Sequence, residues 1–325
     1  MKRLAILITY LALSLTAVAG TFTLMALTSS TAYAHNHDSD SDDDGDNHGS
    51  RSVNQIQPLN ADGEVRIDNL AGSVKVVAWD KDQVQVTGTI GGMVQKLDIS
   101  GDAKSLDIRV VLPHNVEDEG CDACADLQIQ VPKGAHLEVS TVSADVEANG
   151  LTGQVHIGTV SGRIVLNSSA SRIEAKTVSG DVQVVGSGKG ASLDANSVSG
   201  TVHLSDVDGN VITENVSGDI KVMSRHITGL KMSSTSGNLT FEGTPLKGGD
   251  YNLNNVSGDV VLAVGSSPDA RFDVSSFSGD IDNSFGPKPT RVSKYSPGME
   301  LHFSNGSGGA SVSARTLSGD IHLQN

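Results

Sequence analysis

The sequence contains few aromatic residues, and this scarcity limits both its core and its chemistry. Its 325 residues include four Tyr, one Trp and six Phe, against 36 Gly. A core must therefore come from Val, Ile, Leu and Ala in short segments, a composition typical of many strands and almost no helix. Enzymes that cleave polysaccharides on β-helices usually need stacking aromatic side chains, so the composition disfavours that class.

Basic residues are also scarce. The chain has 23 Lys and Arg against 38 Asp and Glu, a formal net charge of −15. Such a surface repels nucleic acid and anionic lipid, so we expect no nucleic-acid partner. The sequence also lacks the motifs of a nucleophile elbow, a phosphate-binding loop or a zinc protease. We therefore assign no catalytic residue, no cofactor and no metal site, and we expect a protein that is not an enzyme.

Only two cysteines are present, Cys121 and Cys124, in the acidic insert "HNVEDEGCDAC". No helix N-terminus is predicted beside them to lower a thiol pKa, which disfavours redox catalysis. In an oxidising compartment we expect them to form a small local disulfide. A metal site with His114 is the alternative, although no fourth ligand is evident.

One long apolar run is present, and it lies at the start of the chain. Lys2 and Arg3 precede an apolar stretch from Leu4 to about Leu27, and the small residues of "TAYA" end at Ala34. This pattern predicts a signal peptide over residues 1–34, cleaved on export to the periplasm or the cell surface. After cleavage we expect no membrane contact. Retention of the run as an anchor is the alternative.

The next segment has no apolar residue. "HNHDSDSDDDGDNHGS" contains six Asp and cannot bury enough surface to offset chain entropy. We predict a disordered, acidic, His/Asp-rich linker over residues 35–54, which could bind divalent cations weakly. An N-terminal β region with the cysteine-containing insert is expected over residues 55–136, and a repeat region over residues 137–325.

A phrase close to "VSGD" recurs through the repeat region. We number each copy from its Ser as position zero; these residues are Ser143, Ser161, Ser179, Ser199, Ser217, Ser236, Ser257, Ser278 and Ser318. A period of about 19 residues indicates a solenoid whose units stack on their neighbours. The last interval is twice as long, which we interpret as two steps with a degraded copy near Pro297. The coil that ends at Asn325 would then lie uncapped at one end.

The columns of the repeat predict its geometry. Positions −6 and −4 are apolar, as are +3 and +5, so each copy contains two strands on either side of the Ser-Gly. Even-numbered positions face the core at −6 and −4, whereas the apolar positions at +3 and +5 are odd. Because Val recurs at −1, we expect the change from even to odd positions facing the core to occur between −4 and −1, with the valines facing the core. Small polar residues at −2 would form a hydrogen-bonded ladder at this bend. The Gly at +1 would avoid crowding or supply an unusual dihedral angle.

The predicted fold is all-β: a β-solenoid, or β-helix-like repeat, with coils of about 19 residues, two short strands per coil and parallel in-register stacking. An antiparallel meander is the alternative. The +2 column is rich in Asp, but it is interleaved with other residues, which argues against a calcium ladder. Asp259 and Asp280 form its one adjacent acidic pair along the chain, and a bound cation would be sought there.

The stretch "FGPKPTRVSKYSPG" interrupts the period. It gathers Lys288, Arg291, Lys294 and Tyr295 on an otherwise acidic chain, and its three prolines disfavour joining a sheet. An irregular projection from a regular scaffold is a candidate ligand-contact loop. A tolerated insertion is the alternative.

Three stretches resemble the bacterial DUF4097 family, whose members are called adhesins. They are "NLAGSVKVVAWDKDQVQVTG" from Asn69, "LQIQVPKGAHLEVSTVSADVEANGLTGQVHIGTVSG" from Leu127, and the recurring "VSGDV". The resemblance implies an exported, β-helix-like protein of the cell envelope. It supplies no catalytic residues.

We therefore expect a non-enzymatic, exported cell-envelope protein, either adhesin-like or a structural scaffold, that contacts a glycan or protein of the envelope or surface. Copies could also associate end to end. The alternatives are a lyase-like, polysaccharide-acting β-helix enzyme and weak metal binding by the His/Asp-rich linker.

Overall fold

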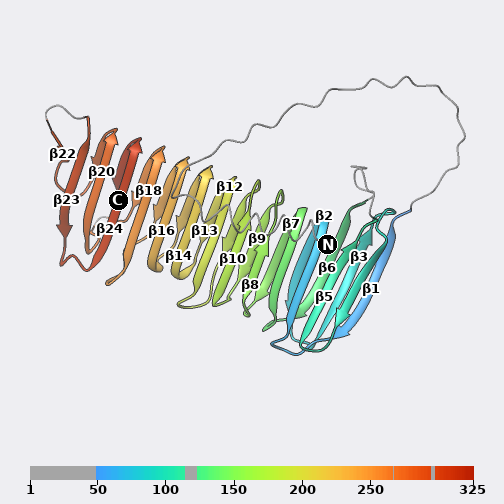
Figure 1. The fold of residues 1–325 in the computed structure, drawn as a ribbon. Coiled ribbons are helices and arrows are strands. Elements are labelled where there is room, and N and C mark those ends of the chain that lie inside the picture. The colour runs from blue at the N-terminus through green and yellow to red at the C-terminus, as the bar shows by residue number, and fades with distance from the viewer. Residues whose placement is uncertain (1–48, 114–122, 266, 294–296) are drawn as a thin grey trace, which may run out of the picture. The chain divides into compact units, whose positions relative to one another are not determined.

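The computed structural model describes residues 49–113, 123–265, 267–293 and 297–325 (Figure 1). The regular elements in these ranges are the strands β1 to β25, so the predicted all-β class is confirmed. In the same ranges no helix is long and apolar enough to span a membrane. Residues 48–325 group as one compact unit.

The strands form two sheets of stacked coils, joined by two long strands, β2 (Glu64–Trp79) and β7 (His136–Leu151), that run through both. In spatial order the first sheet contains β4 (Lys96–Gly101), β5 (Ser105–Val111), the first halves of β2 and β7, β8 (Val155–Gly158), β10 (Arg172–Thr177), β12 (Ser192–Ser199), β14 (Asp208–Ser217), β16 (His226–Ser236), β18 (Asp250–Ser257), β24 (Ala310–Ser318), β20 (Ala270–Ser278), β23 (Met299–Asn305) and β22 (Thr290–Arg291). The second contains β1 (Arg51–Pro58), β3 (Gln83–Ile90), β6 (Ala125–Pro132), the second halves of β2 and β7, β9 (Ile164–Ser168), β11 (Val182–Val185), β13 (Val202–Ser205), β15 (Ile220–Met223), β17 (Leu239–Glu242), β19 (Val260–Ala263), β25 (Ile321–Gln324) and β21 (Ile281–Asn283).

Equivalent columns of the repeat stack in register. Ile173 pairs with Val155 on one side and with Leu193 on the other, and all three occupy position −6. Successive coils of the repeat pair in parallel, so the predicted parallel stacking is confirmed and the antiparallel meander is wrong for these coils.

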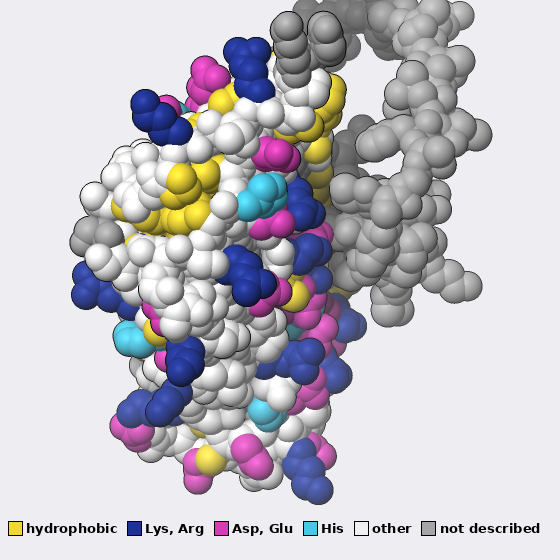
Figure 2. All heavy atoms as spheres, turned by 90° about the vertical axis from the view of Figure 1, so that its left-hand side faces the viewer, with side chains coloured by type: hydrophobic (Ala, Val, Ile, Leu, Met, Phe, Trp, Pro, Cys, Tyr) yellow, Lys and Arg dark blue, Asp and Glu magenta, His cyan; other side chains and the backbone are white. Residues whose placement is uncertain are grey.

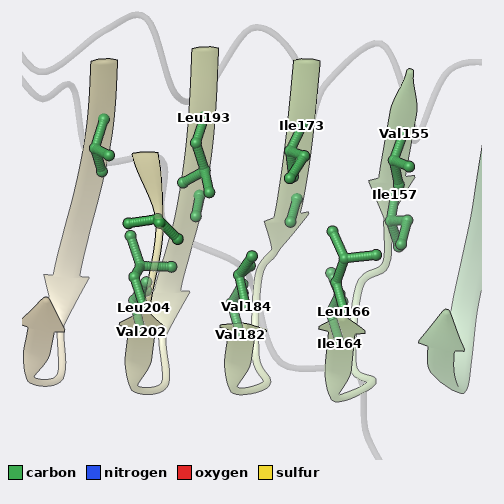
Figure 3. Close-up of a cluster of buried hydrophobic side chains, with 14 of the residues drawn as sticks. Val155, Ile157, Ile164, Leu166, Ile173, Val182, Val184, Leu193, Val202 and Leu204 are labelled. Carbon is green, nitrogen blue, oxygen red and sulfur yellow. The ribbon is translucent and has the colours of Figure 1, made fainter. Parts of the chain in front are cut away.

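The core lies between the two sheets and consists mainly of aliphatic side chains. Figure 3 shows positions −6 and −4 of one sheet pointing toward positions +3 and +5 of the other. The fully buried residues labelled there are Val155, Ile157, Ile164, Leu166, Ile173, Val182, Val184, Leu193, Val202 and Leu204. Aliphatic residues fill this narrow space because β-branched and leucine side chains pack well on a pleated surface.

The predicted orientation of the corner residues is partly wrong. The −2 side chains are buried, whereas the −1 valines are half-buried or exposed, with Val216 at 40% and Val256 at 45%. Inward and outward side chains therefore alternate without interruption from −6 through −2. The change from even to odd positions facing the core occurs at the Ser-Gly that follows. A small polar side chain can lie inside because the neighbouring coil offers it a backbone acceptor.

That acceptor is the carbonyl of the Gly at +1 in the adjacent coil. Asn215 Nδ2 donates to the Gly200 carbonyl at 2.6 Å, and Ser197 Oγ donates to the Gly180 carbonyl at 2.9 Å. The expected ladder therefore runs from side chain to backbone and satisfies carbonyl groups at the bend. It is interrupted at Thr159 and Ser234, whose buried hydroxyls have no hydrogen-bond partner.

The Gly at +1 is required by the closeness of these carbonyls. A Cβ on Gly200 would lie 2.0 Å from the Gly180 oxygen, and one on Gly180 would lie 2.1 Å from the Gly162 oxygen. Further along the repeat, Gly218 also takes a positive φ of 143°. Crowding therefore applies at Gly180, Gly200 and Gly218, and the dihedral angle is a second reason for glycine at Gly218.

The expected coil order is wrong after β19. Val312 of β24 pairs with Tyr251 of β18 on one side and with Phe272 of β20 on the other. The coil β24–β25, residues 310–324, therefore lies between two coils that precede it in the chain, as Figure 1 shows for β24. We call it the inserted coil, and we call β20–β21 the outer coil.

Within the described residues near Pro297, 285–293 and 297–305, no degraded copy of the repeat is present. Instead β23 pairs antiparallel with β20, and β22 pairs with β23 to form this end of the first sheet. Phe303 of β23 stacks on Phe272 at 4.8 Å between ring centroids, and Phe285 lies 5.6 Å from Phe272. The aromatic cluster explains why the coil containing Phe272 is outermost, and the coil ending at Gln324 is not the uncapped end that the sequence predicted.

Candidate binding surface

The predicted contact loop lies at the end formed by β22 and β23. Lys288 and Arg291 are exposed there, whereas Lys294 and Tyr295 fall outside the described residues. Contrary to expectation, part of the loop joins a sheet, because Arg291 pairs with Met299 of β23. The structure therefore holds Arg291 on a strand and not on an irregular projection.

A second feature of the surface was missed by the sequence analysis. Among the described residues, the large exposed hydrophobic side chains are few, and all except Ile56 lie in one row at the corner that follows position −2. We call this row the corner ridge; in spatial order it contains Leu70, Val142, Val160, Val178, Val198, Val216, Thr235, Val256, Leu317, Phe277 and Val292.

Strand register builds the ridge coil by coil. Thr316 pairs with Asn255 and with Ser276, which places the next residue, Leu317, between Val256 and Phe277. Beyond Phe277, the Val292 amide donates to the Gly298 carbonyl at 3.0 Å, which extends the row across β23 to β22. The ridge thus reaches the strand that contains Arg291.

The ridge becomes more apolar toward β22 and β23. Its half-buried valines give way to Val256 at 45%, Leu317 at 51% and Phe277 at 59% exposure. Figure 2 faces this end of the coil stack and shows hydrophobic side chains exposed among basic and acidic ones. Exposed apolar side chains in a contiguous group are typical of interaction sites, whereas single ones are not informative.

The carboxylates at position +2 accept hydrogen bonds that link neighbouring coils. Asp219 Oδ1 accepts a hydrogen bond from the Asn238 backbone amide at 2.7 Å, and Asn238 Oδ1 accepts one from the Asp259 amide at 2.9 Å. In an earlier coil, the Thr201 backbone amide and hydroxyl both donate to Asp181 and lower the pKa of its carboxyl. The recurring Asp therefore satisfies a backbone donor in the next coil.

The expected adjacent acidic pair is separated in space. Asp320 lies between Asp259 and Asp280, and its Oδ1 accepts a hydrogen bond from the Asp280 amide at 2.8 Å. Within the described residues, no group of three or more His, Cys, Asp or Glu side chains could hold a metal ion. The column is therefore explained by hydrogen bonding between coils.

The outer face of the first sheet carries charges of both signs in contact. Lys176 Nζ lies 2.5 Å from Glu174 and 3.5 Å from Asp194, and Lys231 lies 2.6 Å from Glu214. Burial alone would raise the pKa of Glu174, but Lys176 and His156 outweigh burial and lower it. Such pairs are partly exposed and contribute little to stability.

Several predicted features lie outside the described residues. These are the signal peptide, residues 35–48 of the acidic linker, His114 and Cys121. The predicted end of the disordered linker at residue 54 is wrong, because residues 51–54 form the start of β1. The disulfide between Cys121 and Cys124 therefore stays a prediction.

The coil stack and its corner ladders define a β-solenoid-like repeat protein. The family model of Toastrack DUF4097 matches residues 210–324, so this segment belongs to the DUF4097 family, as the resemblance predicted. No curated protein matches the chain.

Solved structures give distant similarities. One is a "putative adhesin" from Bacteroides fragilis NCTC 9343, at 12% identity and a TM-score of 0.35, covering 84% of this chain and 97% of that one. A second, from Parabacteroides distasonis ATCC 8503, has 10% identity and a TM-score of 0.36 over 84% and 97%. A "putative cell adhesion protein" from Clostridium sporogenes ATCC 15579 has 8% identity and a TM-score of 0.27 over 84% and 99%. These scores do not establish a shared function.

Proposed function

We propose that this protein is a non-enzymatic, exported protein of the cell envelope that binds another macromolecule. In this proposal the solenoid, with coils of about 19 residues and two short strands per coil, is the scaffold, and the corner ridge is the contact surface. The observation that carries the proposal is the collection of nearly all large exposed apolar side chains of the described residues into that one row.

The recurring polar residues support a non-enzymatic role. Hydrogen bonds to backbone groups engage most of the buried polar side chains at −2 and most of the Asp side chains at +2, as at Asn215 and Asp219, whereas Ser234 at −2 has no such bond. The repeated phrase therefore encodes stacking and not a row of reactive groups. At the corner, the repeat exposes an apolar edge that is bordered by the exposed serines at position zero.

The partner should combine apolar groups with hydrogen-bonding groups, as an envelope protein or a glycan does. From Leu70 to Phe277, neighbouring side chains of the ridge stand about 4.8 Å apart because this is the spacing of paired strands. Lys288 and Arg291 add positive charge near one end. An extended partner can therefore lie along several coils and reach these cations.

Paired surface variants test the proposal. The full chain carrying Leu317→Ser and Phe277→Ser is compared with Ile56→Ser, which removes an equally exposed apolar side chain outside the ridge. Binding is measured on a glycan array and on envelope fractions, with depolymerisation of each glycan followed in parallel. We expect the ridge variant to lose binding and Ile56→Ser to retain it.

Two outcomes would overturn the proposal. Equal binding by the ridge variant and the wild type would remove the ridge as the contact surface. Turnover of any polymer by the wild-type chain would replace the non-enzymatic assignment with the polysaccharide-acting alternative.

A further inference from the structure

The inserted coil lies between β18–β19 on one side and the outer coil on the other. We call this space its slot and the two flanking coils its walls; both walls carry the same columns of the repeat. Ser318 pairs with Ser257 on one side and with Ser278 on the other. On the second sheet, Ile321 likewise pairs with Val260 and with Ile281. The walls would therefore match each other in register if the slot were empty.

The polar contacts of the inserted coil with its two walls are made by its backbone and by a few side chains. Asp320 bridges the walls, since its backbone amide donates to Asp259 at 2.9 Å and its carboxylate accepts from the Asp280 amide at 2.8 Å. Arg315 lies 3.8 Å from Asp273, and His322 lies 3.2 Å from Asp282 of the outer coil. The same segment of a second copy would offer every one of these groups.

A glycine-rich turn connects the inserted coil to β23. Residues 305–309 cross the start of β20, and Gly306 and Gly308 take φ values of 66° and 68°. Two of these residues contact the carboxylate of Asp269, which directly precedes β20. Ser307 Oγ donates to Asp269 Oδ2 at 2.8 Å, and the Gly309 amide donates to Oδ1 at 3.1 Å.

Asp269 therefore holds the crossing turn in place. The Ala310 amide also donates to the Asp269 backbone carbonyl at 3.1 Å. Donation by Ser307 and Gly309 lowers the pKa of the Asp269 carboxyl, as expected for a carboxylate that accepts several hydrogen bonds. The turn combines flexible residues with one side-chain clamp, which is the arrangement of a hinge.

We propose that the inserted coil is exchangeable between copies: it leaves its slot when the turn at residues 305–309 opens, and the slot accepts residues 310–324 of a second copy.

A second copy is the favoured occupant because the slot specifies both backbone pairing and side chains on two sheets. An unrelated peptide would need apolar residues at four inward positions, a Gly at the crowded corner and an Asp two residues after the Ser. A Cβ at position 319 would lie 2.2 Å from the Gly258 oxygen, so the glycine is needed. Exchange of an identical element between copies is a low-cost route to dimers. This inference goes beyond the proposed binding function and does not depend on it.

Cysteine pairs on separate copies test the exchange. Asn252, on the β18 wall of the slot, pairs directly with Ser313 of the inserted coil. Full-length chains carrying Asn252→Cys and Ser313→Cys, each with Cys121→Ser and Cys124→Ser, are co-expressed and oxidised. If the coil exchanges, a covalent dimer of the two different chains forms. The control is Ser233→Cys with Asn254→Cys, a pair of adjacent residues on β16 and β18, neither of which belongs to the inserted coil, so it should form no such dimer.

A single chain carrying both Asn252→Cys and Ser313→Cys should cross-link within itself, and failure to do so would overturn the slot geometry. Covalent dimer no more abundant than with the control pair would overturn exchange.

A hinge variant gives an independent readout. Asp269→Asn weakens the clamp and should raise the yield of the covalent dimer severalfold. The matched control is Asp126→Asn, which changes another carboxylate that accepts a serine hydroxyl, from Ser73 at 2.7 Å and far from the slot in sequence. Equal dimer yields for both variants would contradict a role for Asp269 in the exchange.

Discussion

The coils from β8 to β19 and the coils after β19 use the same phrase but stack in different orders. In the first group each coil pairs with the one before it in the chain, as Val182 does with Ile164. In the second group the inserted coil separates the outer coil from β18–β19. The phrase therefore specifies how a coil contacts a neighbour, but it does not specify which coil that neighbour is.

Residues outside the phrase decide the order. Phe272 belongs to the outer coil and contacts Phe303 and Phe285, whereas the equivalent residue of the inserted coil is Val312. Aromatic contacts at these distances favour the coil with Phe272 beside β23. In the central coils the aromatic contact between Phe241 and Tyr251, at 5.4 Å between ring centroids, joins consecutive coils and therefore agrees with sequential stacking.

The largest expected effect comes from filling a glycine site in the central coils. Gly200→Ala would place a Cβ 2.0 Å from a backbone oxygen that cannot move without disturbing the next coil. We expect a loss of about 3 kcal/mol in the free energy of unfolding, measured by urea denaturation. Gly158→Ala is the control because nothing lies within 4 Å of its added Cβ. Equal stability of the two variants would disprove the crowding argument.

A smaller effect is expected from the polar ladder. Asn215→Ala removes the donor to the Gly200 carbonyl and should lower the free energy of unfolding by about 1 to 2 kcal/mol. Asn215→Thr should restore part of this stability, because Thr177 donates to the equivalent carbonyl in another coil at 3.4 Å. In the inserted coil, Thr316→Ala should cost less than Asn215→Ala, since the Thr316 hydrogen bond is also 3.4 Å long. A Thr variant no more stable than the Ala variant would argue against the ladder.

The smallest effect concerns pH. The lowered pKa of Asp181 means that its contribution to stability is present above the ordinary pKa of Asp and is lost as pH falls through the lowered folded-state value. Between neutral pH and about pH 3, wild type should lose more stability than Asp181→Asn, which cannot titrate but keeps an acceptor, as Asn238 does. Parallel pH profiles of unfolding for the two chains would contradict this linkage.

Much of the local geometry was predictable from the sequence. Nine copies of one phrase reveal the columns, and glycine and small polar residues at fixed positions reveal the corner. The orientation of the −1 valines was mispredicted because apolar character alone suggested burial, although the strict alternation through −2 already placed them outside. Hydrogen bonds such as that from Asn215 Nδ2 to a backbone carbonyl offset part of the cost of burying this polar column.

Coil order and the end of the ridge could not be predicted in this way. Both depend on which of two similar coils pairs with β18–β19, and periodicity is the same for either choice. The aromatic contact of Phe272 with Phe303 favours the observed coil order. It joins residues on opposite sides of a proline-rich break in the period. The position of Leu317 in the ridge follows from that order.

Disulfide cross-linking of single chains tests the central claim most directly. Asn254 pairs with Arg315, and Arg315 pairs with Ser275, so Asn254 and Ser275 are separated by a whole strand. With Cys121 and Cys124 replaced by serine, Asn254→Cys with Arg315→Cys should form a disulfide within one chain, whereas Asn254→Cys with Ser275→Cys should not. Efficient cross-linking of the second pair and none of the first would show that the coils follow chain order and that the inserted coil does not exist.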